Sequence, residues 1–399
     1  MFEDDIEAGG LLSGIRVLDL SGYEGIYGAR LLADLGADVV RVERDGKDSD
    51  AAPGPFIVNS AGETLSAFCA FANINKRVVN VDLTDNAQRS ALQEMIDSCD
   101  IVLSDRLPEG LIVPRHVALI ETSIFGHVGI GNEYVGSDLV GLAAGGLLSL
   151  GGYPDTPPVA VYGNQAYFSG GIMTGVASVL ALLGRVDAEA PRVDVSVQAT
   201  LVGALEDATA EFDLRGTVRR RAGDQPREAG TGIFRCADGY IAIVAGKLGT
   251  AQAWLNLVAW LQEAGVEGAD ELARDEWKTI EKRREPESLE KFMSIFESYT
   301  TKQKSEWLYR EGQGRSIAVA PVNHMADVLA DPQLTYRDFF RTITSPDFPT
   351  DLKVPGKPYR LYDLPSPDMW SLGIETQLVD VREEWLKPVS LGPREESGV

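Results

Sequence analysis

The alternation of apolar strands with helices constrains the fold of this chain more than any other feature. Five apolar stretches rich in branched residues are predicted to be strands, at 15–20, 38–43, 77–83, 100–105 and 116–126. Helical patterns lie between several of them, such as "NAQRSALQEMIDS" at 86–98. This alternation predicts an α/β fold with a Rossmann-like, doubly wound and mostly parallel sheet, whose ligands bind at the carboxyl ends of the strands.

The chain is too long for one ordinary core, since it has 399 residues. The sequence predicts a large Rossmann-like domain over residues 1–212 and a linker over 213–232, where glycines and clustered arginines break the pattern. A smaller α+β domain is predicted over 233–335. The tail from Leu386 is rich in Pro, Gly and Glu and is expected to be mobile.

Charge and cysteine usage limit the classes of partner. The chain has 37 basic and 60 acidic residues, a net charge of −23, so nucleic acid and anionic membranes are not expected partners. Its three cysteines form neither a metal pattern nor a disulfide framework, which predicts a cytoplasmic protein without a metal site. The longest apolar runs, such as "IMTGVASVLALLG", fall short of the roughly 20 residues of a membrane span.

The glycines after the first strand suggest a dinucleotide site only superficially. Gly22, Gly25 and Gly28 are spaced G-x-x-G-x-x-G, whereas the fingerprint G-x-G-x-x-G brings backbone amides to a pyrophosphate. Tyr23 and Glu24 would crowd and repel that group. Packing of helix against strand is the favoured interpretation, and an NAD-dependent oxidoreductase is a remote alternative.

Six stretches in a fixed order carry a resemblance that covers nearly the whole chain. They are "LLSGIRVLDLSGYEGIYGARLLADLGADVVRVE", "NINKRVVNVDL", "SDLVGLAAGGLLSLGGYPDTPPV", "RVDVSVQA", "PVNHMADVLADPQL" and "VPGKPYRL". In this combination the chain resembles the class III CoA-transferases, which include formyl-CoA transferase and, as a divergent branch, α-methylacyl-CoA racemase. The resemblance implies an interlaced dimer, formed with a second copy of the chain or with a homologous subunit, in which residues 336–399 return to pack on the large domain.

The resemblance also implies coenzyme A or an acyl-CoA as substrate, bound by the large domain. The implied binding residues are Arg44, Lys76, Arg106, Asp105, Tyr23 and Gly25. Arg44 and Lys76 fall where the family contacts the nucleotide end, although Lys76 could also be an ordinary surface charge. Asp105 stands where the family commonly carries Asn, and Arg106 can offset its negative charge.

The position of the family's catalytic residue is occupied by Tyr167. In the family an aspartate attacks the thioester, which gives a mixed anhydride and a free CoA thiolate. The stretch "PVAVYGNQAYFSGG" places Tyr167 at that aspartate, and no Asp or Glu lies between Asp155 and Asp187. A phenol has a pKa near 10, so only about a thousandth of it is ionised at neutral pH. We therefore interpret Tyr167 as the trace of a lost nucleophile.

Tyr167 at the position of the family's aspartate leaves three interpretations of function. The "QAYF" stretch and the "EGIY" turn resemble the aspartate-less subunit of benzylsuccinate CoA-transferase-type enzymes, which implies a structural subunit beside a homologous active one. An active transferase would need another carboxylate, with Glu24 or Asp138 as candidates. A racemase would need His127 and a partner aspartate, which the sequence lacks at that position.

Overall fold

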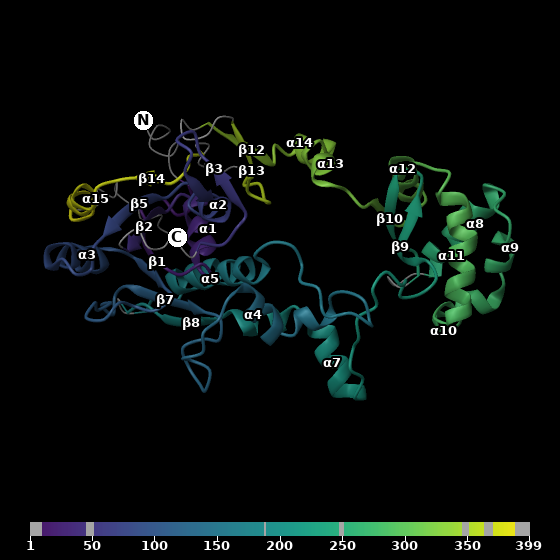
Figure 1. Ribbon diagram of the computed structural model, residues 1–399, viewed down its shortest axis with the longest axis horizontal. Helices are drawn as coiled ribbons and strands as arrows, with labels where there is room; N and C mark the ends of the chain where they lie inside the picture. Colours follow the sequence, from purple (N-terminus) through teal and green to yellow (C-terminus); the bar gives the residue numbers. More distant parts are fainter. Residues whose placement is uncertain are drawn as a thin grey trace, which may run out of the picture. The chain divides into compact units, whose positions relative to one another are not determined.

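The computed structural model describes residues 10–44, 52–186, 189–246, 251–344, 351–362 and 370–387. The chain divides into two compact units, coloured along the sequence in Figure 1. Unit 1 comprises Met1–Ser149, Ala160–Arg219 and Thr335–Val399, and unit 2 comprises Leu150–Val159 and Arg220–Leu334.

Unit 1 is built on a parallel sheet. Its strands are β1 (Arg16–Leu20), β2 (Asp38–Arg44), β5 (Arg77–Val81), β6 (Ile101–Ser104), β7 (Ala118–Ser123), β8 (Arg192–Ser196) and β14 (Ile374–Glu375). Their order is β14-β5-β2-β1-β6-β7-β8, and every neighbouring pair is parallel. The predicted α/β fold with a doubly wound parallel sheet is confirmed.

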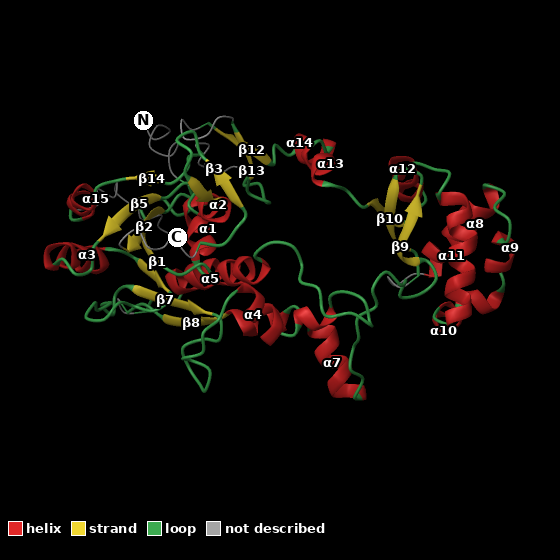
Figure 2. Cartoon of the chain, viewed as in Figure 1, coloured by secondary structure: helices red, strands yellow, loops and turns green. Residues whose placement is uncertain are grey.

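Helices cover both faces of this sheet, as Figure 2 shows. The helices of unit 1 are α1 (Ile26–Asp34), α2 (Ala67–Ala72), α3 (Asn86–Ser98), α4 (Asp138–Ala144), α5 (Gln165–Leu183), α6 (Val197–Gly203), α7 (Glu206–Arg215) and α15 (Leu378–Trp385). Leu18 and Val40 point to the face packed against α3 and α15. Val17 and Val39 point to the opposite face, against α1 and α5. Because both faces are buried, the central strands are mostly apolar, with Asp19 on β1 and Arg41 on β2 as buried exceptions.

Two hairpins extend unit 1. The first pairs β3 (Phe56–Val58) with β4 (Thr64–Ser66), and the second pairs β12 (Phe340–Ile343) with β13 (Leu352–Pro355), both antiparallel. The chain beyond Thr335 therefore belongs to unit 1, where β14 adds to the edge of the sheet beside β5 and α15 packs against α3.

Unit 2 combines a three-stranded antiparallel sheet with helices. Its strands are β9 (Thr231–Cys236), β10 (Gly239–Val244) and β11 (Ala318–Pro321). Its helices are α8 (Ala251–Glu263), α9 (Ala269–Leu272), α10 (Ile280–Arg283), α11 (Pro286–Thr300), α12 (Ser305–Gly314) and α13 (Met325–Leu329), followed by α14 (Pro332–Tyr336) at the boundary between the units. The core is aromatic, with Trp254 stacked on Trp277 and Phe234 against Phe296.

The structure differs in detail from the boundaries expected from the sequence. The expected linker, residues 213–232, overlaps the end of α7 and the start of β9, so the stretch without helix or strand covers 216–230. Residues 150–159 belong to unit 2, although they lie well inside the expected large domain. The tail from residue 388 onward lies outside the described residues.

Helix α5 is longer than the apolar run recognised in the sequence. By length and composition alone, its 19 residues could cross a membrane, and no other helix in the described part of the chain meets that criterion. A core helix of a folded unit meets it equally well, and 44% of the apolar stretch is buried.

Candidate functional site

The strand order places a crevice at the carboxyl end of β1. The chain moves from β1 to β2 on one side and continues from β6 on the other, so the direction of winding reverses between β1 and β6. Ligands of open α/β sheets bind outside the strand ends at such a point. The turn 21–25 follows β1, and Asp105 follows β6. These segments and the start of α5 form the candidate site.

Glycines allow α5 to approach the β1–α1 turn closely. A Cβ on Gly28 would lie 2.6 Å from the carbonyl oxygen of Gly171 and 2.7 Å from Cβ of Thr174. A Cβ on Gly170 would lie 2.8 Å from the carbonyl oxygen of Glu24. No real side chain fits these spaces, so the glycines serve close packing of α1 against α5. This packing sets the start of α5 beside the turn.

Tyr167 lies in the first turn of α5, where Asp138 caps the helix. Oδ1 of Asp138 accepts hydrogen bonds from the backbone N–H groups of Ala166 at 2.8 Å and Tyr167 at 3.1 Å. Carboxylates are favoured at helix N-termini because these N–H groups have no partner within the helix. Burial raises the pKa of Asp138, although the two backbone hydrogen bonds act in the opposite direction.

The phenol of Tyr167 sits in an aromatic environment. Its ring centroid lies 6.3 Å from that of Tyr23 and 6.1 Å from that of Phe68. Burial raises the pKa of Tyr167, and the negative charge of Glu24 raises it further. The structure therefore holds this side chain as a neutral phenol, which is a poor nucleophile.

Glu24 is the carboxylate whose charge acts on Tyr167. Burial raises the pKa of Glu24 to about 7, and the nearby negative charge of Asp105 adds to the shift. Its side chain folds back over its own turn, since a Cβ on Gly22 would lie 2.8 Å from Oε2 of Glu24. Near neutral pH this group is divided between its acid and carboxylate forms.

A buried ion network holds the turn after β1 in place. The ammonium of Lys76 donates to Oδ2 of Asp19 at 2.8 Å, to the carbonyl of Ile26 at 2.8 Å and to Oδ1 of Asn73 at 3.3 Å. Arg41 contacts the other carboxylate oxygen of Asp19 at 3.3 Å. Burial alone would raise the pKa of Asp19, but the charges of Lys76 and Arg41 outweigh it and lower this pKa.

This network corrects the sequence-based prediction for Lys76. Its side-chain nitrogen is completely buried, and its three donors are occupied. Burial lowers the pKa of Lys76 to about 8. No donor remains for a phosphate group, so Lys76 does not fit a nucleotide contact in this structure. A signal was present in the sequence, since Asp19 and Arg41 interrupt strands that are otherwise apolar and need partners when buried.

The structure brings Arg44, Asp105 and Arg106 together at the carboxyl edge of the sheet. A guanidinium nitrogen of Arg44 lies 3.6 Å from Oδ1 of Asp105, with both side chains about one-third exposed. The same oxygen accepts the backbone N–H of Arg106 at 2.8 Å. Tyr23 and Gly25 lie in the adjacent turn, where Gly25 is the N-cap residue of α1. Asp105 therefore partly neutralises Arg44.

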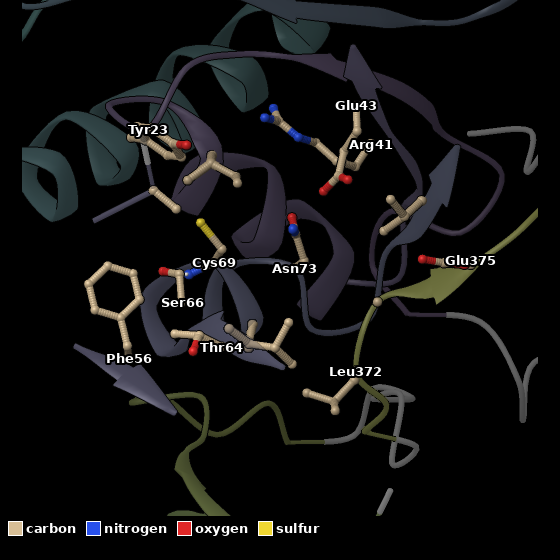
Figure 3. A pocket seen from close by; sticks show the side chains of 16 residues that line it. Tyr23, Arg41, Glu43, Phe56, Thr64, Ser66, Cys69, Asn73, Leu372 and Glu375 are labelled. Carbon is tan, nitrogen blue, oxygen red and sulfur yellow. Dashed lines mark hydrogen bonds between the residues drawn. The ribbon is translucent and has the colours of Figure 1, made fainter. Parts of the chain in front are cut away.

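A cavity of about 310 Å³ opens beside this turn, and Figure 3 shows its lining. It begins at Tyr23 and extends past Arg41 and Glu43 on β2 to Glu375 on β14. Two acidic residues and one basic residue make its lining unfavourable for a polyphosphate. Burial raises the pKa of the Cys69 thiol, which also lines the cavity, so Cys69 is not a ready thiolate.

Within the described ranges, no group of three or more His, Cys, Asp and Glu side chains is placed to hold a metal ion. His127 donates its backbone N–H to Asp194 at 3.0 Å, and its Nε2 is buried. His127 lies in the loop after β7, and Asp194 lies on β8.

Comparison with known sequences identifies the family. A profile described as CoA-transferase family III matches residues 12–372. The chain belongs to CoA-transferase family III. The chain is 34% identical over 374 residues to the subunit BbsE of succinyl-CoA:(R)-benzylsuccinate CoA-transferase from Thauera aromatica, with 90% of each chain covered. It is 27% identical to a succinyl-CoA:mesaconate CoA-transferase from Haloarcula hispanica, covering 90% of this chain and 92% of that one.

Two solved structures support the same fold. A CAIB/BAIF family protein from Brucella suis superposes with a TM-score of 0.78 at 22% identity, covering 94% of this chain and all of that one. The protein Rv3272 from M. tuberculosis gives a TM-score of 0.70 at 20% identity, covering 89% and 94% of the two chains. Family III acts on CoA thioesters, which makes the crevice at β1 and β6 the natural candidate for their binding.

Proposed function

We propose that this family III chain is a non-catalytic subunit, interlaced with a homologous subunit that carries the catalytic aspartate. The assembly would transfer CoA from succinyl-CoA to a carboxylic acid. The observation that carries the proposal is the neutral, half-buried phenol of Tyr167 at the start of α5, where the family pattern has an aspartate. The similarity to a protein described as a subunit agrees with it.

The chemistry explains why tyrosine is a poor replacement. Acyl transfer through the enzyme requires a carboxylate, because a mixed anhydride passes its acyl group on to the thiolate more readily than an aryl ester does. The phenol of Tyr167 is protonated at neutral pH, and its pKa is raised further by burial and by Glu24. Asp138 does not fill the gap, since its Oδ1 holds two backbone N–H groups at the end of α5.

An exposed apolar stripe supports a partner subunit. The stripe runs along α5 at helical spacing and consists of Ile172, Met173, Val176, Leu180 and Leu183. Leu180 is 60% exposed and Leu183 is 79% exposed, while the opposite side of α5 is buried against α1. Contiguous apolar surface of this kind usually marks a protein interface. We therefore assign the stripe to the partner.

The proposal is tested by assaying the purified chain and the assembly. Succinyl-CoA and a panel of carboxylic acids are incubated with the chain alone and with a co-expressed homologue that has the aspartate. We expect transfer in the pair, and the same rate when the pair carries Tyr167→Phe. Robust transfer by the single chain that survives Tyr167→Phe would refute the non-catalytic role. Loss of activity in the Tyr167→Phe pair would instead make the phenol a participant.

Glu24 supports a second candidate, a chain that is active alone with this carboxylate as nucleophile. Its pKa of about 7 leaves a substantial carboxylate fraction at neutral pH, and its charge acts on Tyr167. The matched test is Glu24→Gln in the single chain, with Asp138→Asn as the comparison. Activity that disappears only in Glu24→Gln would favour this candidate over the structural subunit.

We further propose that Arg44 contacts a phosphate of CoA. Arg44 lies at the carboxyl end of β2, is about one-third exposed and has its Asp105 partner at a long 3.6 Å. Titration calorimetry with CoA on Arg44→Ala should show weaker binding than the unaltered protein, and Asp105→Asn should show tighter binding because it removes the competing negative charge. Equal affinities in all three proteins would remove Arg44 from the site.

A further inference from the structure

A second cavity lies at one end of the β12–β13 hairpin, whose two strands are labelled in Figure 1. Phe340 pairs with Pro355, and the backbone N–H of Gly356 continues the ladder to the carbonyl of Phe339 at 2.8 Å. The segments 337–339 and 357–362 therefore leave the hairpin side by side. Between them they enclose about 290 Å³. We name this space the basic cavity, for the residues described next.

The lining carries an excess of positive charge in a strongly acidic chain. Its basic residues are Arg337, Arg341, Lys357 and Arg360, against the single acidic residue Asp338. The chain as a whole has a net charge of −23. Four cations around one small space repel one another, so an anion between them would relieve an unfavourable arrangement.

The described contacts of the arginines leave much of this charge uncompensated. Arg341 forms an ion pair with Asp338 at 2.5 Å, in which the aspartate is 68% exposed. Arg337 donates to the carbonyl of Pro358 at 3.3 Å, and Arg360 donates to the carbonyl of Tyr336 at 2.8 Å. A carbonyl oxygen positions a guanidinium but carries no net charge to neutralise it. Both groups are thus oriented and still cationic.

The walls of the basic cavity are anchored to α1. Arg30 donates to the carbonyl of Pro355 at 3.2 Å, and Lys357 donates to the carbonyl of Asp34 at 3.0 Å. Burial raises the pKa of Tyr359 to about 12, so this lining residue stays a neutral phenol able to donate a hydrogen bond. Groups held in place before binding lose little conformational entropy when a ligand arrives.

We propose that the basic cavity binds the phosphate group of a small metabolite through Arg337, Arg341 and Arg360. Planar guanidinium groups match phosphate oxygens with paired N–H donors. A phosphate monoester offers three oxygens and a charge close to −2, which suits several arginines better than the single charge of a carboxylate. The site is built by other residues than those of the crevice at β1 and β6.

The test uses the protein as purified, with its partner subunit if it has one, and inorganic phosphate as the probe. Phosphate binding is measured by calorimetry at low ionic strength, together with Arg337→Gln and Arg360→Gln. Arg115→Gln is the matched control, because Arg115 is 83% exposed and pairs with Glu189 in the same unit. Circular dichroism confirms that each variant is folded.

We expect saturable phosphate binding that weakens about tenfold in each cavity variant, or about 1.4 kcal/mol, and is unchanged in Arg115→Gln. Displacement of phosphate by CoA, but not by 3′-dephospho-CoA, would identify the 3′-phosphate of CoA as the bound group. Displacement by neither would assign the cavity to another phosphorylated metabolite. Absence of saturable binding up to about 20 mM phosphate, or equal weakening in Arg115→Gln, would overturn the proposal.

Discussion

Replacing Lys76 with Met separates the structural role of this lysine from the nucleotide contact suggested by the sequence. Methionine keeps most of the volume of the side chain and removes its charge. The change leaves Asp19 buried, with Arg41 at 3.3 Å as its remaining described cationic partner. Three hydrogen bonds that hold the turn after β1 are also lost.

The expected cost follows from the burial of both partners. Removing one member of a buried ion pair typically destabilises a protein by about 3–5 kcal/mol, because a charge is left without its partner. Since Arg41 still contacts Asp19, we expect a loss of about 3 kcal/mol for Lys76→Met, near the lower end of that range. Asp19→Asn combined with Lys76→Met should cost less than the sum of the two single changes, since the two side chains interact directly.

Hydrogen exchange followed by mass spectrometry measures this effect locally, which matters in a chain with two units. Peptides from β1 and α1 should exchange faster in Lys76→Met, while the affinity of the folded fraction for CoA should not change. Arg44→Ala is the comparison, because an ion pair whose side chains are about one-third exposed contributes about 0–1 kcal/mol. Unchanged exchange together with a tenfold weaker affinity for CoA in Lys76→Met would refute the structural role.

Further substitutions test the packing, the titration and the interface. Gly28→Ala should destabilise unit 1 by about 1–3 kcal/mol in urea unfolding, whereas Gly203→Ala, with open space around it, should not. Because the pKa of Glu24 is raised, its protonated form stabilises the fold below about pH 4.5, and this contribution is lost as the pH rises through about 7. Glu24→Gln should therefore flatten the fall in the free energy of unfolding over that range. An unchanged slope would contradict the raised pKa of Glu24. Leu180→Glu should reduce the mass of the assembly measured by light scattering. The surface change Gln252→Glu is the control and should leave this mass unchanged. Equal masses for the two variants would show that the apolar stripe on α5 is not an interface.

Much of unit 1 could be read from local patterns. A strand buried on both faces must be apolar throughout, so β1, β2, β5, β6 and β7 were each predicted within a few residues. The helix over 86–98 was predicted with the bounds of α3, where Asp85 caps the first turn. These are short-range effects, because periodicity and capping depend on residues within one element.

The candidate site was only partly predictable. The resemblance assigned Arg44, Asp105 and Tyr167 to the site, and their roles stay a prediction; the structure places Arg44 3.6 Å from Asp105. The resemblance could not show that Lys76 is buried, because the local sequence Lys76-Arg77 fits a buried lysine and a surface lysine equally well. Nor could it tell that Glu24 titrates near neutral pH, since that shift depends on burial and on Asp105 from another strand.

The sequence by itself determined the strand and helix order, the family and the tyrosine at position 167, since each is written in the order of residues along the chain. Only the tertiary structure decided which charges are available to a ligand. Asp19, Arg41 and Lys76 lie far apart in sequence and neutralise one another inside unit 1, while Arg337 and Arg360 meet around a cavity. The physical reason is that the free energy of a charged side chain depends on its solvation and on the charges around it, and folding sets both.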